Sequence, residues 1–128
     1  MSFKSPLNQV IGLGSAKQGA SHWWHQRLTA VAMIPLGLWF AVSLPGLELN
    51  SHAALVAWIQ EPMTSILLVL TVACLAYHSW LGIAVVIEDY VAGGAVKLAA
   101  LVLSSLAHAF LLAVCLFAIL SVAFGVST

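Results

Sequence analysis

The chain has 128 residues, four basic and four acidic side chains, and a formal net charge of zero. Apolar residues make up 62% of it and charged residues 6%, against roughly 25% charged in an ordinary soluble domain. So few charges cannot cover the surface of a water-soluble domain, and no basic field is present to attract nucleic acid. The composition therefore predicts an all-α membrane protein, with membrane lipids and no nucleic acid among its partners.

Three apolar segments follow one another along the chain, and each reaches or approaches the ~20 residues that a helix needs to cross about 30 Å of hydrocarbon. Turn signals separate them at residues 45–46, 61–62 and 93–94, with the stretch from Pro45 to Pro62 expected as a loop. We therefore predict a three-helix transmembrane domain over residues 27–125, with helices at about 27–44, 63–88 and 97–124.

A polar stretch, residues 1–26, precedes the first apolar run, whereas a cleavable signal peptide becomes apolar within a few residues of a short basic head. We expect this segment to remain on the protein at the membrane surface. It is not Arg-rich like an organellar transit peptide, which favours a bacterial inner membrane. All four basic residues (Lys4, Lys17, Arg27 and Lys97) fall on one side of the expected topology. The positive-inside rule then places the N-terminus in the cytoplasm and the C-terminus in the periplasm.

Two histidines interrupt the apolar runs. His78 and His108 each lie about eleven residues from the 88–97 loop, which corresponds to a depth of ~16 Å, near mid-bilayer. An imidazole there is satisfied by a metal, by a haem iron or by a hydrogen bond between helices, and for a single histidine the hydrogen bond is the commoner role. Gly82 lies one turn from His78, where a missing side chain suits either a flat macrocycle or close helix packing.

Polar residues also flank the helices. Tyr90 at the water interface is typical of an anchor in the headgroups, but its phenol could instead donate a hydrogen bond to a quinone carbonyl, with Asp89 beside it as a route for protons. Residues 21–30, SHWWHQRLTA, combine aromatic, histidine and arginine side chains. Arg27 there suits either lipid phosphates, which composition favours, or the carboxylates of a bound cofactor.

Residues 21–30 together with the run 78–90, HSWLGIAVVIEDY, resemble the hydrophobic membrane anchor subunit of succinate dehydrogenase (respiratory complex II), the smaller cytochrome b-type subunit, in its bacterial form. The likeness covers about 100 residues. In that family a histidine stands eleven residues before an Asp-Tyr pair, as His78 does here. The resemblance implies that His78 is an axial ligand of haem b and its iron, and that Tyr90 hydrogen-bonds ubiquinone with Asp89 beside it. It further implies that Arg27 lies near the haem propionates and the quinone pocket, with Ser21 close by.

The resemblance also implies the partners, which are a larger cytochrome b subunit that supplies the second haem ligand, an iron–sulfur subunit and a flavoprotein subunit. The chain would act as a subunit of the enzyme and would not be active alone, so no residue is assigned to the chemical step of succinate oxidation. Two alternatives stay open, an anchor of a fumarate reductase and a purely structural membrane scaffold. The roles of His22, His25 and His108 stay open as well.

Overall fold

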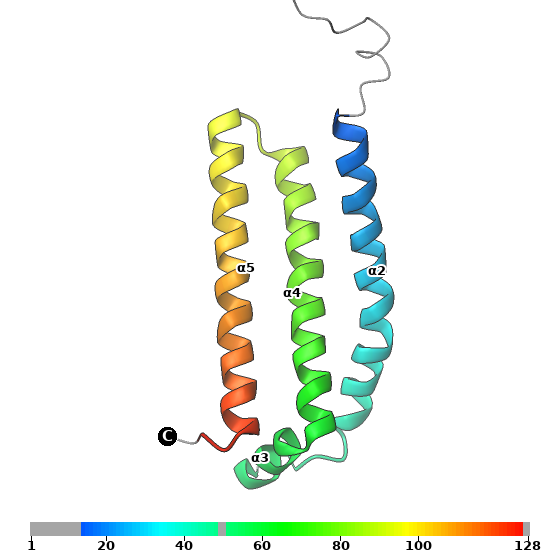
Figure 1. The fold of residues 1–128 in the computed structure, drawn as a ribbon, viewed down its shortest axis with the longest axis vertical. Coiled ribbons are helices and arrows are strands. Elements are labelled where there is room, and N and C mark those ends of the chain that lie inside the picture. Colours follow the sequence, from blue (N-terminus) through cyan, green and yellow to red (C-terminus); the bar gives the residue numbers. More distant parts are fainter. Residues whose placement is uncertain (1–13, 49–50, 127–128) are drawn as a thin grey trace, which may run out of the picture.

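The computed structural model describes residues 14–48 and 51–126, and the regular elements within these ranges are all helices. Three long helices stand side by side in alternating directions, and a short helix lies across one end of them (Figure 1). In chain order the helices are α2 (Gly14–Ser43), α3 (His52–Gln60), α4 (Pro62–Tyr90) and α5 (Gly94–Ala123). The architecture confirms the predicted all-α membrane fold.

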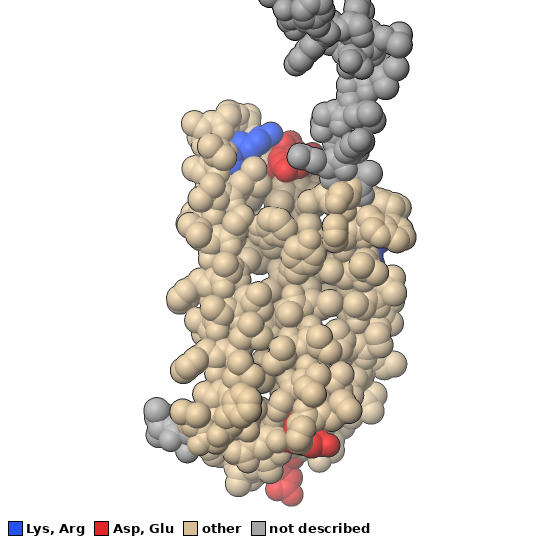
Figure 2. All heavy atoms as spheres, viewed as in Figure 1, with Lys and Arg blue, Asp and Glu red and all other residues tan. Residues whose placement is uncertain are grey.

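Three of the helices are long and apolar enough to cross a membrane, over Ser21–Ser43, Pro62–Tyr90 and Gly94–Ala123. Most of the charged atoms visible on the face drawn in Figure 2 gather at the two ends, and its middle is almost entirely uncharged. Few side chains of the described residues are buried within the chain, with Leu81 and Ala84 of α4 forming the apolar core. Such a surface suits lipid and neighbouring subunits, because hydrocarbon replaces the protein core that a soluble fold would need.

The first membrane helix begins well before residue 27, where the sequence placed its start. α2 runs without interruption from Gly14, so residues 14–26 are helical and continuous with the first membrane helix, whose candidate span begins at Ser21. Residues 14–26 include alanine, lysine and glutamine, which favour a helix. The sequence contains no proline from position 14 to position 34. Residues 1–13 of the expected leader lie outside the described residues. The consequence is that Arg27 lies near the middle of α2.

The expected loop between the first two membrane helices contains α3. Ser51 caps this helix by accepting a hydrogen bond from the Ala54 amide at 3.3 Å, and Pro62 opens α4 immediately after it. Trp58 of α3 stacks on Trp39 of α2 with ring centroids 6.1 Å apart and planes 12° apart. The stacked pair holds α3 against the end of the bundle.

The central helix of the layer is α4, with α2 packed on one side of it and α5 on the other (Figure 1). The connection between α4 and α5 is only residues 91–93, and Gly93 has a φ of 95°, a left-handed conformation that glycine adopts without strain. The N-terminal end of α2 lies at the same end of the molecule as this connection, in agreement with the predicted alternation of the three helices. Side chains in the middle of α4 can therefore contact α2 on one side and α5 on the other, and the remaining ones, such as Leu75, are exposed.

Candidate cofactor site at the middle of the helices

His78 lies near the middle of α4 and is half-buried against α2. At ~1.5 Å per residue it is about 18 Å from Tyr90 along the helix. Two side chains of α2 contact its ring. Thr29 Oγ1 lies 3.0 Å from Nδ1, and Gln26 Nε2 lies 3.2 Å from Nε2. Both ring nitrogens are thus engaged within this chain.

The hydrogen-bond partners of Thr29 indicate which nitrogen of His78 carries the proton. The Thr29 hydroxyl donates to the backbone carbonyls of His25 at 2.9 Å and Gln26 at 3.0 Å, as threonines commonly do within helices. Because its single hydrogen is used in this way, its oxygen accepts from Nδ1–H of His78. Nε2 then keeps its lone pair and accepts from the Gln26 amide. This neutral tautomer has the form that a metal-binding histidine takes, with one nitrogen held by an acceptor and the other free to donate electrons.

Gln26 and Gly82 define the space in front of Nε2. A Cβ added at Gly82 would lie 3.5 Å from Gln26 Nε2, so the carboxamide lies against the glycine, one turn along α4 from His78. The shared contact places His78 and Gly82 on one face, as their four-residue spacing predicts. The other end of the carboxamide, Oε1, is buried and has no hydrogen-bond partner among the described residues. Buried carbonyl oxygens without a hydrogen-bond partner are uncommon in folded proteins.

His108 lies on the opposite side of α4 and is engaged differently. Its Nδ1 donates to the Ser104 carbonyl of its own helix at 2.8 Å, and its Nε2 accepts from the Ser79 hydroxyl at 3.2 Å. Next to this pair, Trp80 Nε1 donates to Ser105 Oγ at 2.9 Å. Nε2 of His108 therefore serves the α4–α5 contact, the interhelical hydrogen-bond role expected for a histidine in the membrane, while Nδ1 is bonded within α5.

Arg27 is exposed on α2, and its guanidinium lies 4.5 Å from the centroid of the Trp23 ring. The backbone of Arg27 follows Gln26 directly, but its guanidinium lies over Trp23, one turn nearer to Ser21, where the spanning part of α2 begins. On the same helix, Nδ1 of His25 donates to the Ser21 carbonyl at 2.8 Å. Its ring packs edge-on against Tyr77 of α4, with centroids 6.2 Å apart. A positive charge within the spanning part of a helix is costly in lipid and calls for a compensating anion.

The predicted quinone residues lie at the end of α4. Tyr90 is 83% exposed, and Asp89 is exposed beside it. Lys97 of α5 reaches back to this end, where its Nζ donates to the Glu88 carbonyl at 2.6 Å. These residues are separated from His78 by about 18 Å of helix, so the chain has two polar locations, one at mid-depth and one at the end.

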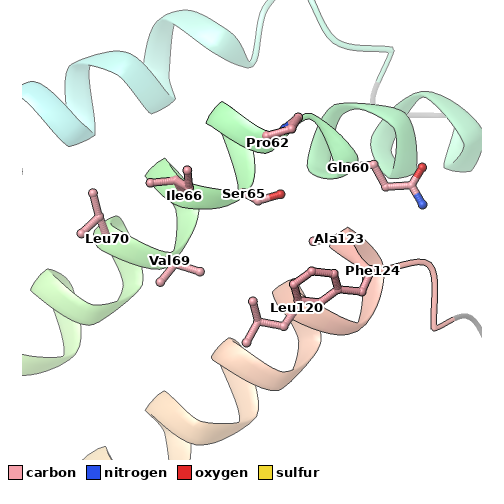
Figure 3. Close-up of a pocket in the computed structure, with 9 residues that line it drawn as sticks. All are labelled: Gln60, Pro62, Ser65, Ile66, Val69, Leu70, Leu120, Ala123 and Phe124. Carbon is pink, nitrogen blue, oxygen red and sulfur yellow. The ribbon is translucent and has the colours of Figure 1, made fainter.

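A third location is an apolar pocket at the opposite end from Tyr90, where α3 meets the start of α4 and the end of α5 (Figure 3). It has a volume of about 440 Å³. Its walls are almost entirely aliphatic and aromatic. None of the residues predicted for a site is among those that line it. The lining residues are Gln60, Pro62, Ser65, Ile66, Val69, Leu70, Leu120, Ala123 and Phe124.

Comparison with known proteins gives the relationship of the chain. Residues 1–121 match the family described as succinate dehydrogenase/fumarate reductase transmembrane subunit. The chain belongs to this family. The curated relatives include the succinate dehydrogenase hydrophobic membrane anchor subunits of Rickettsia bellii, which is 31% identical over 94% of this chain and 88% of its own, and of Paracoccus denitrificans, which is 30% identical over 77% of each. The resemblance seen in the sequence is thereby confirmed. No solved structure matches the chain significantly.

Within this transmembrane subunit, sequence reasoning identified His78 and Gly82 but missed Gln26 and Thr29 as their partners. Both residues lay in the quoted run 21–30, and Thr29 is one of the few buried polar residues described. A signal was present, because a helix that carries His78 at mid-depth needs polar partners at the same depth on its neighbour. The described residues hold no cluster of three His, Cys, Asp or Glu side chains suited to a bare metal ion.

Proposed function

We propose that the chain is the hydrophobic membrane anchor subunit of a succinate:ubiquinone oxidoreductase, in which it helps to bind haem b and to form the site of ubiquinone reduction. The observation that carries the proposal is His78 itself, a mid-membrane imidazole whose Nδ1 is held by Thr29 and whose Nε2 keeps its lone pair. The partners are a larger cytochrome b subunit, an iron–sulfur subunit and a flavoprotein subunit. The names of the curated relatives favour succinate dehydrogenase over the fumarate reductase alternative.

The residues around His78 fit a haem. Nε2 of His78 would donate to the iron, and the hydrogen bond from Nδ1–H to Thr29 would fix the ring and increase its basicity. Gly82 has no side chain, so a flat ring could approach the helix there if the Gln26 carboxamide, which lies against Gly82, gave way. The guanidinium of Arg27, on the helix that carries Gln26 and Thr29, would pair with propionate carboxylates, which supply the anion that a charge in the membrane requires. When bound, the haem supplies a one-electron redox centre, and the larger subunit would supply the second axial ligand.

The end of α4 suits a lipid-soluble quinone. Tyr90 would donate its phenolic hydrogen to a quinone carbonyl, and the bond would strengthen as negative charge develops on that oxygen during reduction. Asp89 would pass protons from water to the reduced quinone. Both side chains are exposed in the single chain and are available to a pocket completed by partner subunits.

The location of these residues also suits electron delivery. Reduction of ubiquinone takes two electrons and two protons, so the site must lie within reach of both the iron–sulfur subunit and water. We place the Tyr90 end on the cytoplasmic side of a bacterial inner membrane, where the positive-inside rule puts Lys97 and the N-terminal lysines. The C-terminus and α3 then face the periplasm.

The test is a reduced-minus-oxidised spectrum of the purified complex, compared between wild type and His78→Ala. We expect loss of the low-spin b-type absorbance in His78→Ala and its retention in His108→Ala, which removes an imidazole at the same depth from the other side of α4. Full haem absorbance in the His78→Ala complex would overturn the haem assignment. Two measurements distinguish a succinate dehydrogenase anchor from a fumarate reductase anchor. They are the quinone that the complex prefers and the ratio of its succinate oxidation rate to its fumarate reduction rate.

A further inference from the structure

Two cavities meet at the end of the molecule where α3 lies across the membrane helices. The apolar pocket described above lies between the start of α4 and the end of α5, and Gln60 of α3 lines its edge (Figure 3). Gln60 also lines a second cavity of about 530 Å³, which is bordered by the first turns of α3 and the end of α5. We call this second cavity the polar pocket, because His52 and Ser121 line it together with Gln60. An apolar space and a more polar one therefore share a wall.

The apolar pocket presents hydrocarbon to whatever occupies it. Of its two polar residues, Ser65 donates its hydroxyl hydrogen to the Ile59 carbonyl, and Gln60 donates from Nε2 to the Val122 carbonyl at 3.2 Å. The Gln60 carboxamide points away from the apolar side chains (Figure 3). Apolar walls hold water poorly, and an unfilled space forfeits dispersion contacts, so the favoured occupant is a flexible apolar chain.

The two pockets lie where the membrane spans end. The candidate span of α4 begins at Pro62 and that of α5 ends at Ala123, and both residues line the apolar pocket. Most residues of the polar pocket lie outside these spans, in α3 and after Ala123. A molecule with a chain in the hydrocarbon and a headgroup at the water boundary matches this order. Tyr90 is ~42 Å from Pro62 along α4, so the pockets are separate from the proposed quinone site.

The charge at this end discriminates between headgroups. The sequence has two glutamates, Glu48 and Glu61, and no lysine or arginine in residues 43–65 and 115–128. Acidic atoms are visible at the α3 end of the face drawn in Figure 2. These carboxylates repel an anionic headgroup, whereas a zwitterionic headgroup adds no net charge and carries an ammonium group that they attract.

We propose that this end of the protein is a binding site for a zwitterionic phospholipid. One acyl chain fills the apolar pocket, and the headgroup lies in the polar pocket, where the side chains of His52 and Ser121 can hydrogen-bond the phosphate. The lipid contacts α3, α4 and α5 together. The proposal does not depend on haem or quinone binding, so it stands or falls separately from the proposed function.

The experiment is a lipid titration of the whole, delipidated complex, followed by native mass spectrometry. The probes are palmitoyl-oleoyl phosphatidylethanolamine and palmitoyl-oleoyl phosphatidylglycerol, which have the same chains and differ in headgroup charge. Val69→Phe places a ring in the apolar pocket. Val102→Phe is the matched control, because it makes the same substitution at an exposed position of α5 that lines neither pocket. If Val69→Phe complexes do not assemble, Ala123→Leu makes a smaller change in the same pocket.

We expect wild type and Val102→Phe to bind one phosphatidylethanolamine that Val69→Phe binds about tenfold more weakly. At this site phosphatidylethanolamine should bind about threefold more tightly than phosphatidylglycerol, the size of an interaction between exposed charges. Replacing Glu48 and Glu61 together by glutamine should remove the preference, and Glu88→Gln at the other end should retain it. Equal lipid binding in wild type and the pocket variant would show that a neighbouring subunit covers the pocket. Tighter binding of phosphatidylglycerol in wild type would overturn the choice of headgroup.

Discussion

Nε2 of His108 lies 3.2 Å from Oγ of Ser79, the residue that follows His78 on α4. His78 of α4 thus faces α2, whereas His108 of α5 faces α4 from the other side. His108 is tied to its own backbone through Nδ1 and to α4 through Nε2, so the structure gives it an interhelical contact on the side away from His78.

We expect His108→Leu to weaken the packing of α5 on α4 without removing the haem. Interhelical hydrogen bonds in membrane proteins contribute about 0.6 kcal/mol on average and up to roughly 1.7. The thermal dissociation midpoint of the purified complex should fall by a few degrees while the low-spin absorbance at low temperature stays intact. His108→Gln, which can still accept from Ser79, should lie closer to wild type. Loss of the haem spectrum in His108→Leu at low temperature would contradict this role.

Thr29→Val should raise the midpoint potential of the haem without removing the haem from the complex. The substitution keeps the shape of the side chain and removes the oxygen that accepts from Nδ1–H of His78. An accepting oxygen makes the imidazole a stronger donor to the oxidised iron, so its loss should raise the midpoint potential. A net hydrogen bond of about 1 kcal/mol corresponds to a shift of tens of millivolts. A redox titration of the purified complex measures it, and Thr29→Ser should retain the wild-type potential. Equal potentials in the valine and serine variants would exclude this hydrogen bond from the haem-bound state.

Arg27→Leu should insert and assemble but hold haem less well or reduce quinone more slowly. The guanidinium lies 4.5 Å from the centroid of the Trp23 ring, within the spanning part of α2 and near its start at Ser21. Leucine removes the charge that would pair with propionate or pocket carboxylates. Haem content per flavin and quinone turnover are the measurements. Arg27→Lys, which keeps the charge and loses the planar fork, should be intermediate. Normal haem content and turnover in Arg27→Leu would contradict the cofactor role and indicate that Arg27 contacts lipid phosphates.

Tyr90→Phe should lower succinate–quinone turnover by about tenfold or more, because phenylalanine keeps the aromatic body of an interfacial anchor and removes the donor to the quinone. Succinate oxidation with a soluble dye that accepts electrons from the earlier redox centres should be unchanged. Asp89→Asn should show a milder form of the same split through slower protonation. The ratio of quinone activity to dye activity, at equal complex content, is the quantity to compare. A wild-type ratio in Tyr90→Phe would leave Tyr90 as a headgroup anchor.

Much of the fold could be predicted because each membrane helix is a long apolar run bounded by proline or glycine. Positions along a helix follow from residue counting, so the depths of His78 and His108 could be read from the sequence. The contacts between helices could not. They depend on how each helix is rotated about its axis, and helices that are apolar around most of their circumference carry little information on that rotation. The pairing of His78 with Gln26 and Thr29 was missed for this reason.

The boundary of α2 and the existence of α3 were missed for other reasons. Residues 14–26 are polar enough to read as a surface segment, yet their helix propensity lets α2 continue through them. α3 is too short for a hydropathy window, although Ser51 before it and Pro62 after it are ordinary boundary signals. Weighing such local signals in the stretch from 45 to 62 would have revealed the short helix.

The two connections between the membrane helices differ sharply in length, and this difference bears on biogenesis. Residues 91–93 join α4 to α5 so tightly that these helices must enter the bilayer together as a hairpin. The segment between α2 and α4 is long enough to hold α3, so α2 can be released into lipid first and dock on the hairpin later. The contact between α2 and α4, where His78 meets Gln26, would then form as the last step of assembly within this chain. The stage at which the subunit can accept a large planar cofactor would accordingly be the docking of α2.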